Sequence, residues 1–193
     1  QKERQSIFIP TEFSSVAIDK DNFVYTTTST VDQYNPEESE PVRRQSPNGD
    51  NIIRISNGNY PIGDENYLFG GDTFSGPSRF CDIAVWNNLM YSVLDETRNR
   101  IFTYDHNGSL LFVYGGYGES DGYFSRPRAI EHYNEKLYVL DSKAGSISVL
   151  VPTQYTKNLI LATDYTAEGD YASALSAWTK VLEYNCNNEL AYQ

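Results

Sequence analysis

The feature that most constrains this chain is a segment that repeats itself and then stops. Residues 80–116 and 124–150 share one order of events: a Phe, a short apolar stretch through an Ala, a turn, a Tyr-containing stretch ending in Asp, and a third apolar stretch. The shared alanines, Ala84 and Ala129, lie 45 residues apart. A period of this length with several short strands per unit is typical of β-propeller blades. The repeat therefore predicts an architecture and does not by itself predict a reaction.

A third copy opens the chain. Residues 13–19 match residues 80–86, so that Ala17 corresponds to Ala84, and the remaining strands of this copy are expected near 23–26, 51–56 and 67–71. Residues 28–50 are then an insertion between the second and third strands. We predict a mainly β fold: a partial, open propeller of about three four-stranded blades.

Three blades are too few to close a ring, because closed propellers use about four to eight. The segment 7–9 has the pattern of an outer strand from a preceding blade, and the third copy has no outer strand of its own. We therefore expect either a piece of a longer propeller or an open half. An open half exposes sheet edges that invite pairing, which predicts self-association.

The linkers between the copies carry a family resemblance. Residues 115–127 read GGYGESDGYFSRP, and 70–77 is a shorter version; each is followed by Ala in an apolar strand, then by Tyr-Val-x-Asp and Arg-Ile patterns. Over residues 13–150 the chain resembles NHL repeats, most closely in the second copy. The first copy lacks the Asp after its second strand, and the third has Gly145-Ser146-Ile147 where Arg-Ile is usual. The resemblance implies a propeller that serves as a binding platform, although a minority of the family are enzymes.

The character of the chain changes after Pro152. Apolar residues recur at helical spacing on both sides of Gly169-Asp170, which predicts a helical hairpin. The pattern around Tyr165, Ala174 and Trp178 resembles one tetratricopeptide repeat over about 155–188, and residues 189–193 look like the first turn of a second. We divide the chain into blades at 1–152 and a helical hairpin at 153–193. One hairpin cannot bury its apolar face alone, so we expect it to pack on the last blade or on another molecule.

The composition limits the classes of molecule that the chain is expected to bind. The formal net charge is −11, with 15 basic and 26 acidic residues. This excess argues against nucleic acid, whose binding depends on Lys and Arg, and against anionic lipid surfaces. No apolar run is long enough to span a bilayer, and the sequence from Gln1 has no signal-peptide pattern. Cys81 and Cys186 lack metal-ligand spacing and are interpreted as two buried thiols.

Candidate site residues come from the ends of the inner strands, which line one face of a propeller. Asp19, Trp86 and Glu131 occupy equivalent positions there, and their differing types favour a binding face; with Tyr133 they form the predicted ligand-binding set. Asp95 and Asp141 also occupy equivalent positions, but their repetition favours turn capping over acid–base chemistry.

The favoured function is a non-enzymatic protein-interaction scaffold with a protein or peptide partner and no cofactor. Two alternatives remain open: a fragment of a metal-dependent propeller hydrolase or lyase, with a cation at Asp19 or Glu131, and a carbohydrate-binding propeller, with Trp86 and Tyr133 stacking on sugars. The sequence places no catalytic residue and no metal site. The two resemblances, the acidity and the high Tyr and Asn content favour the exposed, extracytoplasmic part of a larger membrane-anchored bacterial protein.

Overall fold

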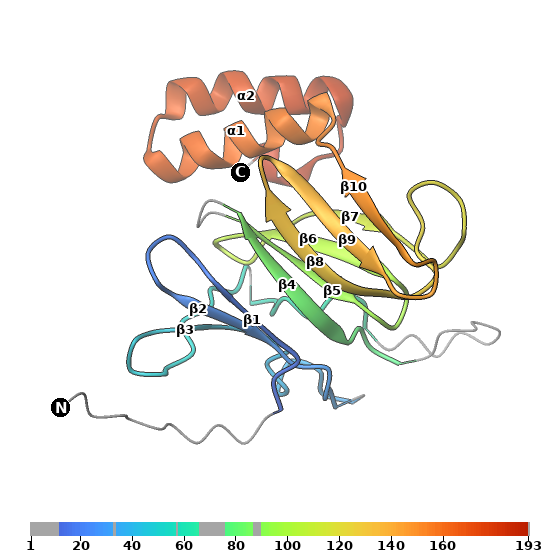
Figure 1. Ribbon diagram of the computed structural model, residues 1–193. Helices are drawn as coiled ribbons and strands as arrows, with labels where there is room; N and C mark the ends of the chain where they lie inside the picture. The colour runs from blue at the N-terminus through green and yellow to red at the C-terminus, as the bar shows by residue number, and fades with distance from the viewer. Residues whose placement is uncertain (1–11, 33, 57, 66–75, 87–89, 193) are drawn as a thin grey trace. The chain divides into compact units, whose positions relative to one another are not determined.

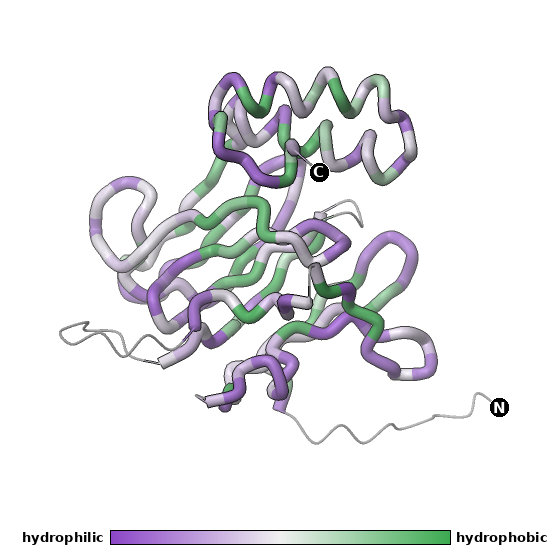
Figure 2. Tube along the Cα trace, turned by 180° about the vertical axis from the view of Figure 1, so that it is seen from behind, coloured by the Kyte–Doolittle hydropathy of each residue, from purple (hydrophilic) through white to green (hydrophobic). Residues whose placement is uncertain are grey.

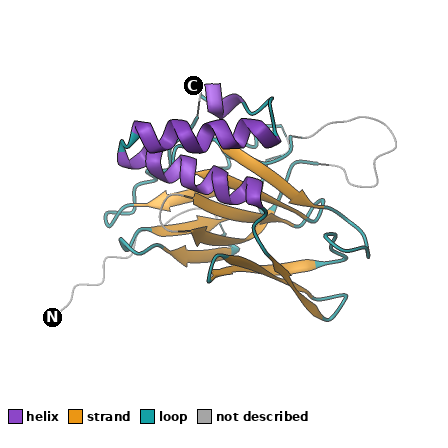
Figure 3. Ribbon diagram, turned by 90° about the horizontal axis from the view of Figure 1, so that it is seen from above, coloured by secondary structure: helices purple, strands orange, loops and turns teal. Residues whose placement is uncertain are grey.

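The computed structural model describes residues 12–32, 34–56, 58–65, 76–86 and 90–192 (Figure 1). Two compact units make up the chain. The first comprises Gln1–Glu131 with Val139–Ser148, and the second comprises His132–Tyr138 with Val149–Gln193. The described strands form three antiparallel sheets, of three, four and three strands, and the two α-helices follow the last strand (Figure 3). The predicted mainly β fold with a C-terminal helical hairpin is confirmed.

The first sheet contains β1 (Ser15–Ile18), β2 (Val24–Thr27) and β3 (Val42–Gln45) in that order. The prediction for its third strand was wrong: β3 lies inside the expected insertion 28–50, and residues 51–56 form only isolated bridges. The physical reason is burial. Val42 is fully buried and pairs with Thr27, whereas a turn at 46–50 folds Asn51 back onto Gln45. The long connection is therefore 28–41.

The second sheet is the complete copy. It contains β4 (Phe80–Trp86), β5 (Met90–Asp95), β6 (Arg100–Asp105) and β7 (Leu110–Gly115) in sequential order. Every residue of β5 is buried. This is the pattern of a strand in a sheet that is covered on both faces. The hairpin between β6 and β7 turns at Gly108, whose φ of +85° suits glycine. A Cβ there would clash with the Arg54 carbonyl oxygen.

The third sheet contains β8 (Pro127–Tyr133), β9 (Lys136–Asp141) and β10 (Ser146–Leu150) in the order β10-β9-β8. The predicted turn between β8 and β9 is present, with Asn134 and Glu135 both at positive φ. Such consecutive values belong to the tight turns that join antiparallel strands. No fourth strand follows β10 in the described part of the chain. The outer strand expected at 67–71 and the strand expected at 7–9 lie outside the described residues.

A core joins the first and second sheets. Tyr25 and Val42 of the first sheet pack in one cluster with six buried residues of the second, namely Phe80, Ile83, Tyr91, Val93, Phe102 and Tyr104. Aromatic rings dominate it: Tyr25 lies 5.7 Å from Tyr91, centroid to centroid, and Tyr91 stacks on Tyr104 at 5.6 Å. Three tyrosines and two phenylalanines therefore serve the packing of these two sheets.

The helical hairpin contains α1 (Gln154–Glu168) and α2 (Tyr171–Tyr184), followed by the short 3-10 helix η1 (Glu189–Tyr192). Thr153 caps α1, Gly169 ends it in a left-handed conformation, and the Asp170 side chain caps α2, which are the usual roles of these residue types. Apolar and polar residues alternate along both helices (Figure 2). The buried side chains of the pair are mostly small and apolar, including Leu159, Ala162, Ala174, Ala177 and Val181.

Candidate functional site

The carboxylate of Asp19 is engaged by its own sheet. The side chain is buried, and Oδ1 accepts hydrogen bonds from the backbone N–H groups of Asp21 and Phe23, both at 2.9 Å. Oδ2 accepts a bond from the Arg44 guanidinium at 3.2 Å. These bonds close the turn between β1 and β2 and join it to β3. Binding a cation at Asp19 would therefore require breaking this network.

Trp86 is a core residue, which corrects its interpretation as a stacking platform. Its side chain is only 4% exposed, and its Nε1–H donates to Ser92 Oγ at 2.9 Å. Ser92 Oγ is in turn 2.7 Å from Thr103 Oγ1. A buried Trp needs such a partner for its N–H, and the polar chain across β4, β5 and β6 supplies it. The available sequence signal was the pair of polar residues, Ser92 and Thr103, inside two otherwise mostly apolar strands.

Glu131 and Tyr133 are the two exposed members of the predicted set. Both lie on β8, two positions apart, and their side chains therefore leave the same face of the strand. Glu131 belongs to the first compact unit and Tyr133 to the second. The structure thus brings Asp19 to Arg44 and Trp86 to Ser92, and it leaves the ligand-binding role of Glu131 and Tyr133 a prediction.

Sequence reasoning missed Asp82, which connects all three sheets. Its Oδ1 accepts a hydrogen bond from the Ser15 hydroxyl on β1, and its Oδ2 accepts one from the Ile130 backbone N–H on β8 at 2.7 Å. Asp82 itself lies on β4, so one carboxylate ties the inner strands of neighbouring sheets on both sides. An Arg128–Glu96 ion pair at 2.6 Å adds a second link between the second and third sheets. A charged residue inside an otherwise apolar strand was the available signal.

Asp95 and Asp141 cap equivalent turns, as their repetition predicted. Asp95 accepts backbone N–H bonds from Arg79, Thr97 and Arg98 at 2.9–3.2 Å. Asp141 accepts four such bonds, from the backbone N–H groups of Ser125, Arg126, Lys143 and Ala144. Each side chain therefore joins the turn after its own strand to the loop that precedes its sheet. This arrangement gives both carboxylates a structural role.

The two caps differ in their acid–base behaviour. Burial raises the pKa of Asp95 above its ordinary value despite the backbone N–H bonds. Burial also raises that of Asp141, but the four N–H donors outweigh it and hold its pKa below the ordinary value. A lowered folded-state pKa contributes stability that is lost as the pH falls through it, and a raised one contributes stability that is lost as the pH rises.

The two capping aspartates should have opposite effects on the pH dependence of folding stability. We expect Asp141→Asn to flatten the loss of folding stability on acidification, because it removes a group that gains protons mainly on unfolding. Asp95→Asn is expected to steepen that loss, because it removes a group that binds its proton more tightly when folded. Urea unfolding followed by tryptophan fluorescence over about pH 3 to 6, around the ordinary carboxyl pKa, measures both slopes. Equal changes of slope in the two variants would contradict the assignment.

Burial controls the acid–base behaviour of Cys81 and His106. Burial raises the pKa of Cys81 to about 12, which keeps it protonated and unreactive at neutral pH. Burial likewise lowers the pKa of His106, which lies in the turn after β6. Among the described residues, no three His, Cys, Asp or Glu side chains are placed to hold a metal ion. No helix within the described ranges combines the length and apolarity needed to cross a bilayer.

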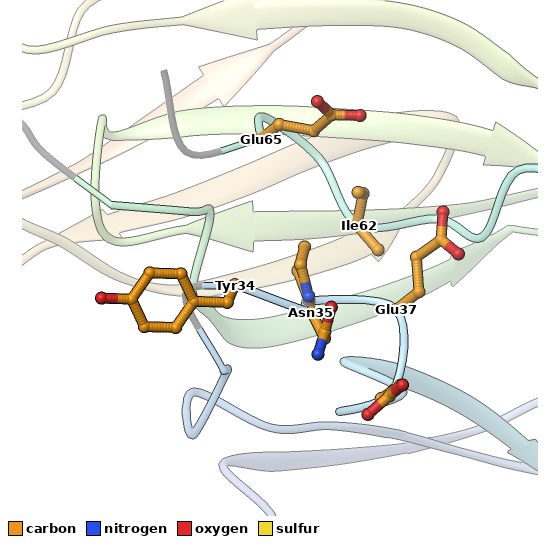
Figure 4. Close-up of a pocket in the computed structure, with 7 residues that line it drawn as sticks. Tyr34, Asn35, Glu37, Ile62 and Glu65 are labelled. Atoms are coloured by element: carbon orange, nitrogen blue, oxygen red, sulfur yellow. The ribbon is translucent and has the colours of Figure 1, made fainter. Parts of the chain in front are cut away.

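Two cavities of about 370 Å³ each lie in the first compact unit. One is formed by the long connection 28–41 against the segment before the second sheet, and Figure 4 shows the ring of Tyr34 turned away from Glu37 and Ile62; its lining is Tyr34, Asn35, Pro36, Glu37, Glu38, Ile62 and Glu65. The other lies between the 118–125 linker and the turn after β9. Both are predominantly polar and open.

Comparisons with known proteins find only distant likenesses. No family model matches the chain, and no curated protein matches it. Among solved structures, U3-55K gives a TM-score of 0.41 at 10% identity, over 77% of this chain and 42% of that one. The computationally designed Ika4 protein gives 0.39 at 13% identity, over 79% and 100% of the two chains. The β-propeller domain of Cps50 (Swd1) from Myceliophteria thermophila gives 0.35 at 9%, over 73% and 54%. We draw nothing about function from likenesses of this extent.

Proposed function

We propose that this chain is a non-enzymatic protein-interaction module, in which NHL-type propeller blades precede one tetratricopeptide-like hairpin. The observation that carries the proposal is apolar surface at both ends of the series of sheets. Val16 and Ile18 are exposed on the first sheet, and Leu140 and Ile147 are exposed on the third. Single exposed apolar residues are ordinary, but β-branched and leucine side chains grouped on strand faces are typical of interaction sites.

The hydrogen bonds made by four aspartate side chains favour a binding role over a catalytic one. Asp19, Asp82, Asp95 and Asp141 each accept hydrogen bonds that hold turns or strands together. A catalytic carboxylate needs a free oxygen within reach of substrate. The proposal therefore assigns these residues to the scaffold.

The hairpin adds a second apolar surface. Leu161 of α1 and Leu175 of α2 are exposed, as are Tyr171 and Tyr184 at the two ends of α2. In helical repeat arrays such side chains are covered by the next repeat or by a bound segment. This supports a peptide or protein as the partner of the hairpin.

A binding measurement tests the proposal. A polypeptide recovered on the immobilised chain would be purified and titrated by calorimetry, and we expect saturable binding that Leu175→Glu or Ile18→Glu weakens. Leu110→Glu, at an exposed position of β7, is the matched control and should leave binding unchanged. If all three variants bind equally, the apolar surfaces are not the interaction sites and the proposal is wrong.

A second titration tests the alternative function, a metal-dependent hydrolase or lyase. We expect no saturable heat on adding calcium or zinc, because the Asp19 carboxylate is already occupied by Arg44 and two N–H groups. Stoichiometric binding that is lost in Glu131→Gln would favour the hydrolase or lyase instead. Asp50→Asn, a change of the same charge in the turn after β3, controls for loss of charge.

A further inference from the structure

The exposed faces at the two ends of the sheet series are the counterparts of two faces that are buried in the second sheet. The first half lies on the inner strand. Ile83 and Val85 flank Ala84 on β4; Ile83 is 3% exposed in the core shared with the first sheet, and Val85 packs against that core. Val16 and Ile18 flank Ala17 in the same way on β1, yet they are 63% and 64% exposed. The first sheet covers Ile83 and Val85, whereas no described sheet covers Val16 and Ile18.

The pairing registers support this equivalence. On the second sheet Ile83 pairs with Val93 and Val85 with Tyr91, which places all four on the face toward the first sheet. On the first sheet Val16 pairs with Thr26 and Ile18 with Val24. The face of β1 and β2 that carries Val16 and Ile18 is therefore the counterpart of the face that the second sheet buries.

The second half lies on the opposite face. Leu94 of β5 pairs with Ile101 of β6, and both are fully buried. The sequence Val-Leu-Asp recurs at the end of β9, so that Leu140 is the counterpart of Leu94, and Ile147 of β10 is the counterpart of Ile101. In the third sheet these two residues are 43% and 63% exposed.

We propose that a second copy of this chain covers these surfaces, with the first sheet of one copy packed on the third sheet of the other. This rests on the proposed function and names the partner. The contact is head-to-tail, since it joins two different surfaces, and such contacts close into rings when the rotation allows. Two copies would supply six sheets, within the range of about four to eight that closed propellers use.

The first test is the mass of the unmodified chain in solution. Sedimentation equilibrium at physiological ionic strength, where repulsion between chains of net charge −11 is screened beyond about 8 Å, should give twice the chain mass of 21.9 kDa. A mass of one chain at every concentration would overturn the proposal. Binding of a different polypeptide, lost in Ile18→Glu, would in that case still support the interaction module.

The second test separates head-to-tail association from the alternatives. Ile18→Glu blocks one face and Ile147→Glu the other, so each variant alone should associate about tenfold or more weakly, because the contact would bury an unpaired carboxylate. An equimolar mixture of the two variants should recover dimers, since one unmodified pair of faces remains between them. Leu110→Glu should associate like the unmodified chain.

Other results would contradict the contact. If either variant alone stays dimeric, a face pairs with its own copy or with the hairpin, and loss of association in Leu175→Glu identifies the hairpin. If both variants are monomeric and the mixture is too, the two faces do not meet. The comparison requires that Ile18→Glu and Ile147→Glu both retain cooperative thermal unfolding. If they do not, Val16→Ser and Leu140→Ser replace them in the same mixing experiment. These two changes shrink the same faces without adding charge.

Discussion

Leu94→Ala is expected to destabilise the fold by about 2–5 kcal/mol, the range found for leucines truncated in closed cores. Leu94 is fully buried in a strand whose every residue is buried, so the surrounding sheet cannot collapse onto the space left behind. Urea unfolding at neutral pH, followed by tryptophan fluorescence, measures the change in the free energy of unfolding.

Leu140→Ala is the matched control for that experiment. It makes the same chemical change at the equivalent position of the third sheet, where the side chain is partly exposed. At protein concentrations low enough to keep the chain monomeric it should cost less than about 1 kcal/mol, because only part of the apolar area is removed from water. Equal costs at the two positions would contradict the assignment of Leu140 to an uncovered face.

Asp82→Ala is expected to cost about 3 kcal/mol, because hydrogen bonds to a charged group contribute more than neutral ones. The substitution removes the acceptor of both the Ser15 hydroxyl and the Ile130 N–H. The backbone N–H of Ile130 would then lack its acceptor. The loss should appear as lower cooperativity as well as lower stability, since the three sheets share this side chain.

Two variants resolve the contributions at Asp82. Ser15→Ala removes one bond and should cost about 1 kcal/mol. Asp82→Asn retains one carbonyl oxygen and should fall between Ser15→Ala and Asp82→Ala. Thermal unfolding observed by near- and far-ultraviolet circular dichroism gives stability and cooperativity together. If Asp82→Ala unfolds like the unmodified chain, the carboxylate is not a link between sheets.

The second sheet shows how far sequence reasoning reaches. Its four strands, its turn at His106-Asn107-Gly108 and the capping role of Asp95 follow from local patterns: alternating apolar residues, residues that favour turns, and an Asp side chain close to free N–H groups. The helical hairpin follows from apolar spacing and from the breaker pair Gly169-Asp170 in the same way. In each case most of the interacting residues are near neighbours along the chain.

The first sheet shows where reasoning from the sequence fails. The segment 51–56 has a strand-like composition, yet Val42–Gln45 takes the third position because Val42 enters the core beside Tyr25. The predicted set at the inner-strand ends had a similar outcome. Asp19 was placed at a strand end as predicted, but its ion pair with Arg44 spans 25 residues, and Trp86 was turned inward by its bond to Ser92.

By itself, therefore, the amino-acid sequence determined the repeat, the strand and helix types, the turns and the switch from sheets to helices near Pro152, because each depends on residues close together in the chain. Only the tertiary structure decided which segment became β3, which equivalent side chains are covered and which are left open, and that Asp82 ties three sheets together. Those outcomes depend on packing and desolvation between residues far apart in the sequence, and a repeated pattern is the same whether or not a neighbouring sheet is present to cover it.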